Sequence, residues 1–406
     1  MGNIHDSPMQ RTWRRLLKNK PAVISLCIII IAIFIAIFAP LIATDNTPDA
    51  NDQILELANM SPGYQTSLLK VRKDREEPPT SWLKKIFVGV ENPYTLIPIT
   101  SYTLEGNILK AKVYKGILIP PSEEDFLLTD IAFANSINNK DIQLRNGKAY
   151  YTDYSEKKAS IDVKTLQNIV KTENITERKF YLGTDAYGRD ILSRLLFGVR
   201  VSISVGFVAV LISLTIGITL GAIAGFYRGK LDNFIMWFIN VVWAIPTVLL
   251  AMAISFALGS YIDSFWIIYI AVGLSMWVEV ARIVRGQVMG VREMEYIQAA
   301  KGLGYNDFRT ITRHVLPNII GPIMVVSASD FASAILIEAG LSMLGIGVRP
   351  PMPSWGVMLN EQHNYLFTDG KAFLALIPGL CIMVMVLVFN LLGNGLRDAF
   401  DVKGKL

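Results

Sequence analysis

The stretch REMEYIQAAKGLGYNDFRTITRHVLPN, residues 292–318, carries the strongest structural signal in this chain. It begins with good helix formers and is then interrupted by Gly302 and Gly304, which are poor ones. Helical spacing resumes with Asn306 or Asp307 as the N-cap residue and continues to the proline before the next apolar run. The stretch is too polar to cross a membrane, so it predicts two short helices joined by a glycine turn on a membrane face.

Two uses fit this pair of helices. The small Ala299-Ala300 pair beside the break suits insertion of the helix into a cleft of a partner protein. Alternatively, the two helices form an amphipathic hairpin that lies in the membrane interface. The pattern alone favours neither use.

Long apolar runs flank this loop on both sides. A helix rises 1.5 Å per residue, so about 20 apolar residues cross a bilayer. The fourth run is the weakest, because only residues 264–278 lie between Asp263 and Glu279. Six membrane spans are predicted, at residues 22–43, 202–226, 233–258, 263–281, 318–340 and 372–393.

The composition of the 406 residues agrees with a membrane protein. Hydrophobic residues make up 52% and charged residues 18%, whereas soluble domains carry about 25% charged residues. This excludes a disordered chain and a small disulfide scaffold, and it argues against a wholly soluble enzyme. The net charge of +5 comes from basic residues beside the apolar spans, which indicates membrane topology and not nucleic-acid binding.

Lys and Arg residues are distributed unevenly over the short connections. Sixteen lie in the two tails, in residues 227–232 and in residues 282–317, whereas only Arg349 and Lys371 lie in the short connections of the other side. Positively charged connections stay in the cytoplasm. The distribution therefore predicts that both termini are cytoplasmic.

The long polar segment after the first span is then extracytoplasmic, and it is predicted to be an α+β domain. Residues 108–118 contain a stretch of alternating apolar and polar residues, and Asn146-Gly147 is a strong hairpin signal. Residues 122–136 and 161–172 have helical spacing.

No catalytic, metal or cofactor motif is present in the sequence. Residues 225–230 (GFYRGK) are one residue short of a P-loop and are followed by Leu231 instead of Ser or Thr. His5, His314 and His363 lie far apart, and no Cys-x-x-Cys pattern occurs. The chain is therefore expected to carry no catalytic residues, bound metal or cofactor.

The loop resembles the EAA loop of ABC-importer permeases. Its matching features are Gln-Ala-Ala at 298–300, Gly304 after three residues, and His-Val-Leu-Pro317 after nine more. Two residues depart from that pattern, since Gln298 replaces the usual Glu and His314 replaces an apolar residue. Five further segments resemble the oligopeptide, dipeptide and nickel branch of this family: WRRLLKNKPAVISL (13–26), FAPLIA (38–43), GTDAYGRDILSRLLFGVRVSISVG (183–206), EAGLSMLGIGVRPPMPSWGVML (338–359) and GNGLRDAFD (393–401).

This resemblance covers about residues 11–44 and 180–401 and implies an all-α polytopic fold with six transmembrane helices. The α+β segment between the first and second helices is an insert, since that loop is typically short in this branch. The expected parts are a cytoplasmic N-tail (1–21), a first transmembrane helix (22–43), the extracytoplasmic insert (44–180), a permease domain of five helices (181–393) with a coupling loop (292–317), and a cytoplasmic C-tail (394–406).

The resemblance also implies a location and partners. The chain would lie in the plasma (inner) membrane of a bacterium, within the lipid bilayer, and form a heterodimer with a sister permease. Two cytoplasmic ABC ATPases would hydrolyse ATP, and an extracytoplasmic binding protein would deliver the substrate. No nucleic acid is implied.

Two groups of residues are candidates for function. The resemblance assigns ATPase coupling to residues of the loop, and two carboxylates in the fifth span are candidates for a translocation path because such groups are costly in a membrane. For Glu338, near the outer end of that span, a structural hydrogen bond competes with this role, and for Asp330 a contact with the partner subunit does. The coupling residues are Gln298, Ala299, Ala300, Gly304, Asp307, Leu316 and Pro317.

The predicted function is import of oligopeptides or dipeptides. The same family leaves nickel or another small solute open. An ion-coupled secondary transporter would need inverted repeats and several midplane charges, and no repeat is found. A membrane-tethered sensor or enzyme working through residues 45–180 would not need five later spans.

Overall fold

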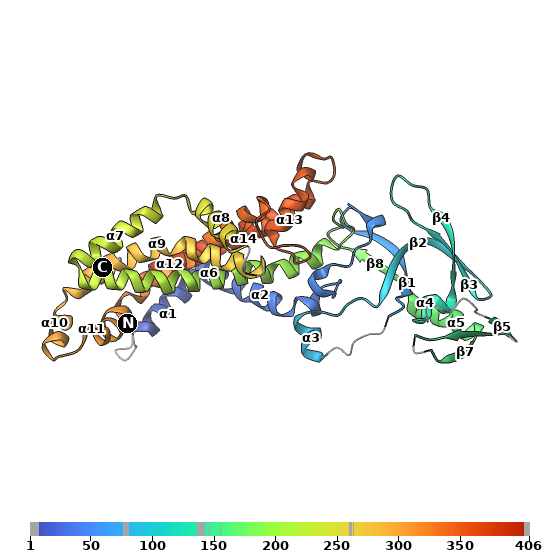
Figure 1. Cartoon of the computed structure of the whole chain (residues 1–406), viewed down its shortest axis with the longest axis horizontal. Coiled ribbons are helices and arrows are strands. Elements are labelled where there is room, and N and C mark those ends of the chain that lie inside the picture. Colours follow the sequence, from blue (N-terminus) through green and yellow to red (C-terminus); the bar gives the residue numbers. More distant parts are fainter. Residues whose placement is uncertain are drawn as a thin grey trace. The chain divides into compact units, whose positions relative to one another are not determined.

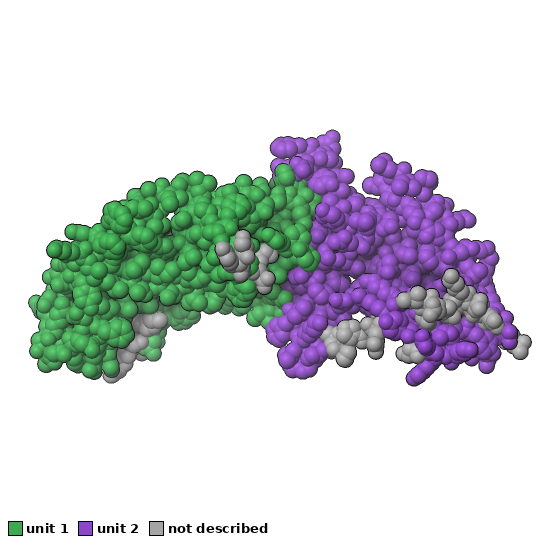
Figure 2. All heavy atoms as spheres, viewed as in Figure 1, with its two compact units in different colours: residues 1–37, 198–363, 375–406 green, residues 38–197, 364–374 purple. Residues whose placement is uncertain are grey.

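A computed structural model describes residues 8–75, 81–135, 143–145, 147–154, 156–259, 262 and 264–401. The chain divides into two compact units, shown in different colours in Figure 2. One unit comprises residues 1–37, 198–363 and 375–406, and the other comprises residues 38–197 and 364–374.

Within the described residues, five helices are long and apolar enough to cross a membrane, and a sixth span arises if one bent helix pair counts as a span. The sequence places all of them close to where they occur. The helices, labelled in Figure 1, are α2 (Lys20–Ile42), α6 (Ile191–Tyr227), the bent pair α7 (Gly229–Trp243) and α8 (Thr247–Leu258), α9 (Ser264–Arg292), α12 (Ile320–Met343) and α14 (Phe373–Phe400).

The third predicted span differs from its expectation. The sequence predicts one span over residues 233–258, but α7 and α8 meet at an angle of 90°. The residues between them, Ala244 to Pro246, leave the helix because proline lacks the N–H that would continue it. The cavity described below lies at this break, and residues of α7, α8, α9 and α12 line it.

Helix α6 packs closely against α9 through glycines spaced four residues apart. A Cβ atom on Gly221 would lie 2.5 Å from the carbonyl oxygen of Ala281. One on Gly225 would lie 2.7 Å from the carbonyl oxygen of Arg285. The absence of side chains at these positions lets the two backbones approach, as small residues do in membrane helix pairs.

The insert is built on two antiparallel sheets, with strand order β4-β3-β2-β1-β8 in one and β5-β6-β7 in the other (Figure 1). Buried Leu69, Leu109, Leu128 and Leu166 belong to one core that the larger sheet shares with two short helices. The strands are β1 (Tyr64–Arg72), β2 (Tyr94–Glu105), β3 (Ile108–Val113), β4 (Ser122–Leu127), β5 (Gln143–Arg145), β6 (Lys148–Thr152), β7 (Lys158–Asp162) and β8 (Ile175–Phe180).

The predicted hairpin and one predicted helix of the insert are confirmed. Arg145 pairs with Lys148 at the end of the β5–β6 hairpin, although Asn146 itself lies outside the described residues. Helix α5 (Val163–Ile169) and the π-turn that follows it (Val170–Asn174) occupy the second helical stretch.

The helix expected at residues 122–136 is wrong in its first half. Residues 122–127 form strand β4, and only Leu128–Ala132 are helical (α4). The acidic residues of β4 lie opposite basic residues of β3, with Lys110 paired to Asp125 and Lys112 to Glu123. Opposite charges across two strands stabilise the pairing, and this outweighs the helical preference of the acidic run.

Short helices complete the chain. They are α1 (Pro8–Lys18), α3 (Trp82–Phe87), α10 (Glu295–Gly302), α11 (Asp307–Thr310) and α13 (Trp355–Gln362), with 3-10 turns at Pro48–Ala50, Leu55–Leu57, Leu316–Ile319 and His363–Phe367 and a second π-turn at Ile311–Val315.

Candidate functional site

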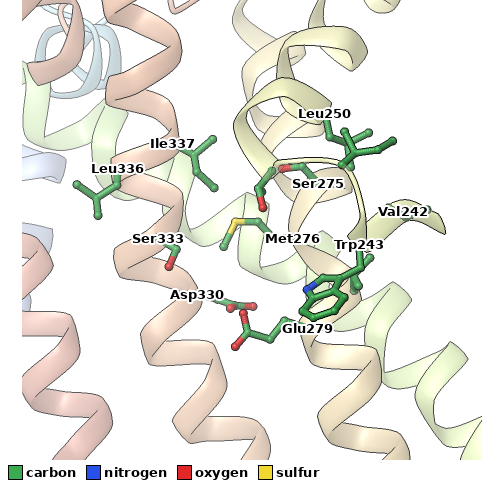
Figure 3. A pocket seen from close by; sticks show the side chains of 13 residues that line it. Val242, Trp243, Leu250, Ser275, Met276, Glu279, Asp330, Ser333, Leu336 and Ile337 are labelled. Carbon is green, nitrogen blue, oxygen red and sulfur yellow. The ribbon is translucent and has the colours of Figure 1, made fainter. Parts of the chain in front are cut away.

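A cavity of about 340 Å³ lies beside the break between α7 and α8. Helices α9 and α12 complete its wall (Figure 3). Most of its lining side chains are apolar, and the polar ones come from α8, α9 and α12. These polar residues are Thr247, Ser275, Glu279, Asp330 and Ser333.

Asp330 on α12 lines this cavity, and its side chain is almost fully buried, with 4% of its surface exposed. The hydroxyl of Ser213 on α6 donates a hydrogen bond of 3.3 Å to its Oδ2 atom. Because carboxylates are costly inside a membrane, a buried one that faces a cavity is a candidate for contact with solute or water.

Glu279 on α9 lies at the same cavity, and the sequence analysis did not select it. Figure 3 shows its carboxylate and that of Asp330 pointing toward one another. The sequence analysis used Glu279 only to mark the end of the fourth span. Helix α9 continues past this residue to Arg292, so Glu279 lies inside the helix. Its position within a 29-residue helix was the signal that could have identified it.

Trp243, the last residue of α7, forms another part of the cavity wall (Figure 3). The guanidinium of Arg282 stacks on the indole ring at 4.1 Å from its centre. This cation–π contact holds the end of α7 against α9 and fixes the position of the ring.

Glu338, the second carboxylate predicted on α12, does not line this cavity. It is 1% exposed, and its Oε1 atom accepts hydrogen bonds of 2.8 Å from Ser342 and from Ser354. Ser354 is also the N-cap residue of α13, where its hydroxyl accepts from the backbone N–H of Val357. Glu338 therefore links α12 to the start of α13.

The predicted coupling residues lie on α10, on α11, in the turn between them and in the 3-10 turn Leu316–Ile319. Gly304 has φ = +82°, a conformation that side-chain-bearing residues rarely adopt. Asn306 is the N-cap of α11, since its Oδ1 atom accepts from the N–H of Arg309 at 2.8 Å. The second helix is shorter than expected, because a π-turn and a 3-10 turn replace regular helix before α12.

The predicted coupling residues differ in exposure. Gln298, Ala299 and Asp307 are exposed, as are Gly304 and Pro317. Ala300 is 4% exposed, and Leu316 is half-buried beside the cluster that contains Ile297, Val315 and Val288. This cluster attaches the loop to the ends of α6 and α9.

Two large apolar side chains of the loop have no cover in the single chain. Leu303 is 76% exposed and Phe308 is 77% exposed. They flank the Gly304 turn, so the tip of the loop presents an apolar surface suited to a protein partner.

Among the residues that the structure describes, no group of three or more His, Cys, Asp or Glu side chains could hold a metal ion. The site comprises a cavity among the membrane helices with two facing carboxylates, and the loop 292–317 has an apolar tip.

Comparison with known proteins assigns the chain to a family. Residues 217–403 match the family described as binding-protein-dependent transport system inner membrane component, and residues 7–62 match the N-terminal TM domain of oligopeptide transport permease C. Neither match covers residues 63–216, where all eight described strands lie.

Three relatives illustrate the similarity. The glutathione transport system permease protein GsiD of Pectobacterium atrosepticum is 41% identical over 225 residues, which are 55% of this chain and 73% of that protein. The dipeptide transport system permease protein DppC of Alkalihalophilus pseudofirmus is 41% identical over 225 residues, covering 55% and 72%. DppC of Bacillus subtilis is 37% identical over 223 residues, covering 55% and 68%.

The motifs, the membrane helices and these relatives agree, and the chain belongs to the binding-protein-dependent transport system inner membrane permeases, in their oligopeptide, dipeptide and nickel branch.

Proposed function

We propose that this permease imports small peptides, driven by ATP hydrolysis in partner subunits. The proposal rests chiefly on the cavity between α7, α8, α9 and α12, whose polar groups lie in an otherwise apolar wall. Support for peptides as the solute comes from the relatives, which are named as glutathione, dipeptide and di/tripeptide permeases.

Within this proposal, Asp330 lies on the translocation path and Glu338 has a structural role. The position of Asp330 at the cavity supports the first assignment. The two serine hydrogen bonds that hold Glu338 between α12 and α13 support the second.

A sister permease in the membrane and two cytoplasmic ABC ATPases are the proposed partner subunits, and an extracytoplasmic binding protein delivers the solute. The loop from Gln298 to Pro317 docks onto an ATPase. Exposed Ala299 and the apolar side chains of Leu303 and Phe308 form the docking surface, while buried Ala300 and Leu316 attach the loop to its own chain. Movement of the ATPases would then reach α9 and α12, between which the cavity lies.

The proposed orientation has both termini in the cytoplasm and the insert outside. It is tested in a variant whose Cys27 and Cys381 are replaced by Ala, with single cysteines at Lys148 in the insert or at exposed Lys230 in the first turn of α7. An impermeant thiol reagent should label the first in intact cells and the second only after lysis. Labelling of Lys230→Cys in intact cells would reverse the orientation.

The transport function is tested by uptake of labelled dialanine in the native host with and without this chain. Uptake should fall when the chain is deleted and return when it is supplied. It should stop when ATP is depleted and continue when a protonophore removes the proton gradient at constant ATP. Unchanged dialanine uptake combined with lost uptake of labelled nickel would replace the peptide by a metal ion. If dialanine uptake instead stopped when only the proton gradient was removed, at constant ATP, the chain would be a secondary transporter.

A further inference from the structure

Glu279 and Asp330 are two acidic groups that face each other in the cavity without a basic partner. Asp330 is 4% exposed, and one hydrogen bond of 3.3 Å from Ser213 is its sole hydrogen bond to described residues. Across the described ranges, neither carboxylate forms an ion pair with a Lys, Arg or His side chain. Of the nearest arginines along α9, Arg285 binds Asp232 outside the cavity, whereas Arg282 stacks on the cavity residue Trp243 and forms no ion pair with Glu279 or Asp330.

Asp330 is buried, whereas Glu279 beside it is exposed at the cavity, so the pair favours a proton or a cation next to Asp330. Burial of one carboxylate without a counter-charge costs several kcal/mol, and a second negative charge close by adds to that cost. In a membrane helix, such groups usually face a functional cavity, where a partner compensates them. A positively charged ligand at the cavity removes both penalties.

We propose that Glu279 and Asp330 form a binding subsite for the protonated amine of the transported solute. This inference rests on the proposed function, since it assigns a solute group to the peptide path. An ammonium group donates three hydrogen bonds. The two carboxylates supply two acceptors, and the exposed hydroxyl of Ser333, next to them in Figure 3, supplies the third.

The residues around the pair favour an amine over a metal ion. A calcium ion requires six to eight oxygen ligands, and transition metals prefer His or Cys. The described part of the chain offers no third His, Cys, Asp or Glu at this place. The cavity of about 340 Å³ is at the lower end of the usual size of a small-molecule site, about 300 to 1,000 Å³. It therefore accommodates a small amine, with the apolar wall in contact with its carbon atoms.

The subsite is tested by protection of a cysteine placed in the cavity. In the purified complex with Cys27 and Cys381 replaced by Ala, Thr247→Cys, at an exposed cavity position outside the subsite, is alkylated by a small thiol reagent. Alaninamide, which carries an ammonium group and no carboxylate, should slow this reaction. N-acetylalaninamide has the same carbon skeleton without the charge and should not slow it.

The substitutions Glu279→Gln and Asp330→Asn keep the shape of each side chain and remove its charge. Either one should raise the alaninamide concentration needed for half-maximal protection about tenfold. This is the loss of affinity expected for one charge-assisted hydrogen bond. The matched carboxylate control is Glu173→Gln, at an exposed position of the insert, which should leave protection unchanged. The matched cysteine control is Thr312→Cys, exposed on the coupling loop, whose alkylation alaninamide should not affect.

Several outcomes would overturn the subsite. The first is equal protection by alaninamide and by N-acetylalaninamide. The second is protection by alaninamide that persists in both carboxylate variants. The third is protection by calcium or nickel ions and not by alaninamide. If one variant fails to assemble, the other gives the same comparison, because each carboxylate is expected to contribute. The assay needs no transport, so failure of dialanine uptake in the host would reject the proposed function separately from the subsite.

Discussion

Arg285 on α9 and Asp232 on α7 form a two-pronged ion pair. The Nε and Nη2 atoms of the guanidinium donate to Oδ1 and Oδ2 of the carboxylate at 2.6 and 2.7 Å. Asp232 is 9% exposed at its side chain and Arg285 is 26% exposed. This ion pair and the stacking of Arg282 on Trp243 add to the apolar contacts of Ile235 and Ile239 in holding α7 against α9.

Asp232→Asn is expected to lower the free energy of unfolding by about 2 kcal/mol, since hydrogen bonds to a charged partner are lost in a largely buried position. The thermal denaturation midpoint of the purified protein in detergent measures this. The control is Glu293→Gln, which breaks the exposed ion pair of Arg228 and Glu293 (2.8 Å) and should cost under about 1 kcal/mol. If both variants lowered the free energy of unfolding equally, the Arg285–Asp232 pair would stabilise the protein no more than an exposed ion pair does.

Gly221→Leu should destabilise the membrane unit by about 1–3 kcal/mol or prevent its assembly, because its side chain would collide with the backbone of α9 at Ala281 and Arg285. The matched control is Gly286→Leu on α9, where a Cβ atom meets nothing within 4 Å. Thermal denaturation and the yield of folded protein measure both. A Gly221→Leu protein as stable as the Gly286→Leu protein would contradict the close α6–α9 contact.

Gly304→Ala is expected to weaken coupling and leave membrane insertion intact. Its cost of about 1–2 kcal/mol arises from the positive φ, because the space around the residue is open. Peptide uptake should fall about tenfold for such a cost, with solute-stimulated ATPase activity falling in parallel. Gly302→Ala is the control, since Gly302 lies in α10 with open space around it, and alanine is the better helix former. Normal uptake by the Gly304→Ala variant would mean that the turn does not couple the subunits.

Ala299→Asp tests the docking surface more directly than Ala300→Asp. Ala299 is exposed, whereas Ala300 is buried against its own chain, so a charge at 300 would disturb local packing as well as docking. The Ala299→Asp protein should fold normally and fail to bind an ATPase subunit, because docking would bury an unpaired charge. Co-purification with the ATPase gives the result, and retention of a wild-type amount would contradict the proposed surface.

The outer part of the insert can be removed without breaking its base. Leu69 on β1 pairs with Ile175 on β8, so residues 70–174 can be replaced by Asn-Gly, a two-residue hairpin turn, together with Leu69→Thr. The cluster of Ile54, Leu57, Met60, Leu68 and Phe180 stays complete.

We expect this shortened protein to assemble and to show weaker uptake when the binding protein is limiting, with basal ATPase activity retained. The physical reason is that the insert lies on the proposed outer side, where the binding protein must dock, so we expect its removal to weaken docking and leave the membrane path intact. Uptake equal to that of the full chain at every binding-protein concentration would identify the insert as a tolerated addition, since surface insertions cost little free energy.

The sequence by itself located the membrane helices, the glycine turn and the β5–β6 hairpin. These features depend on neighbouring residues, because the bilayer thickness requires a continuous apolar run and a hairpin needs its own turn residues. The family motifs were readable for the same reason. The single selected residue that lines the cavity, Asp330, was found because a carboxylate in an apolar run is conspicuous without any structure.

Tertiary structure decided what lies next to Asp330. Glu279 is 51 residues away in sequence, and the rotation of α9 against α12 brings the two carboxylates to one cavity (Figure 3). That rotation depends on contacts between helices, such as the α6 glycines against α9, and no local pattern encodes it. Strand β4 was mispredicted for a similar reason, because its pairing with the lysines of β3 overrides the helical preference of its own residues. Spans and turns are properties of a segment, whereas a site requires distant segments to meet, and packing between them determines which side chains do so.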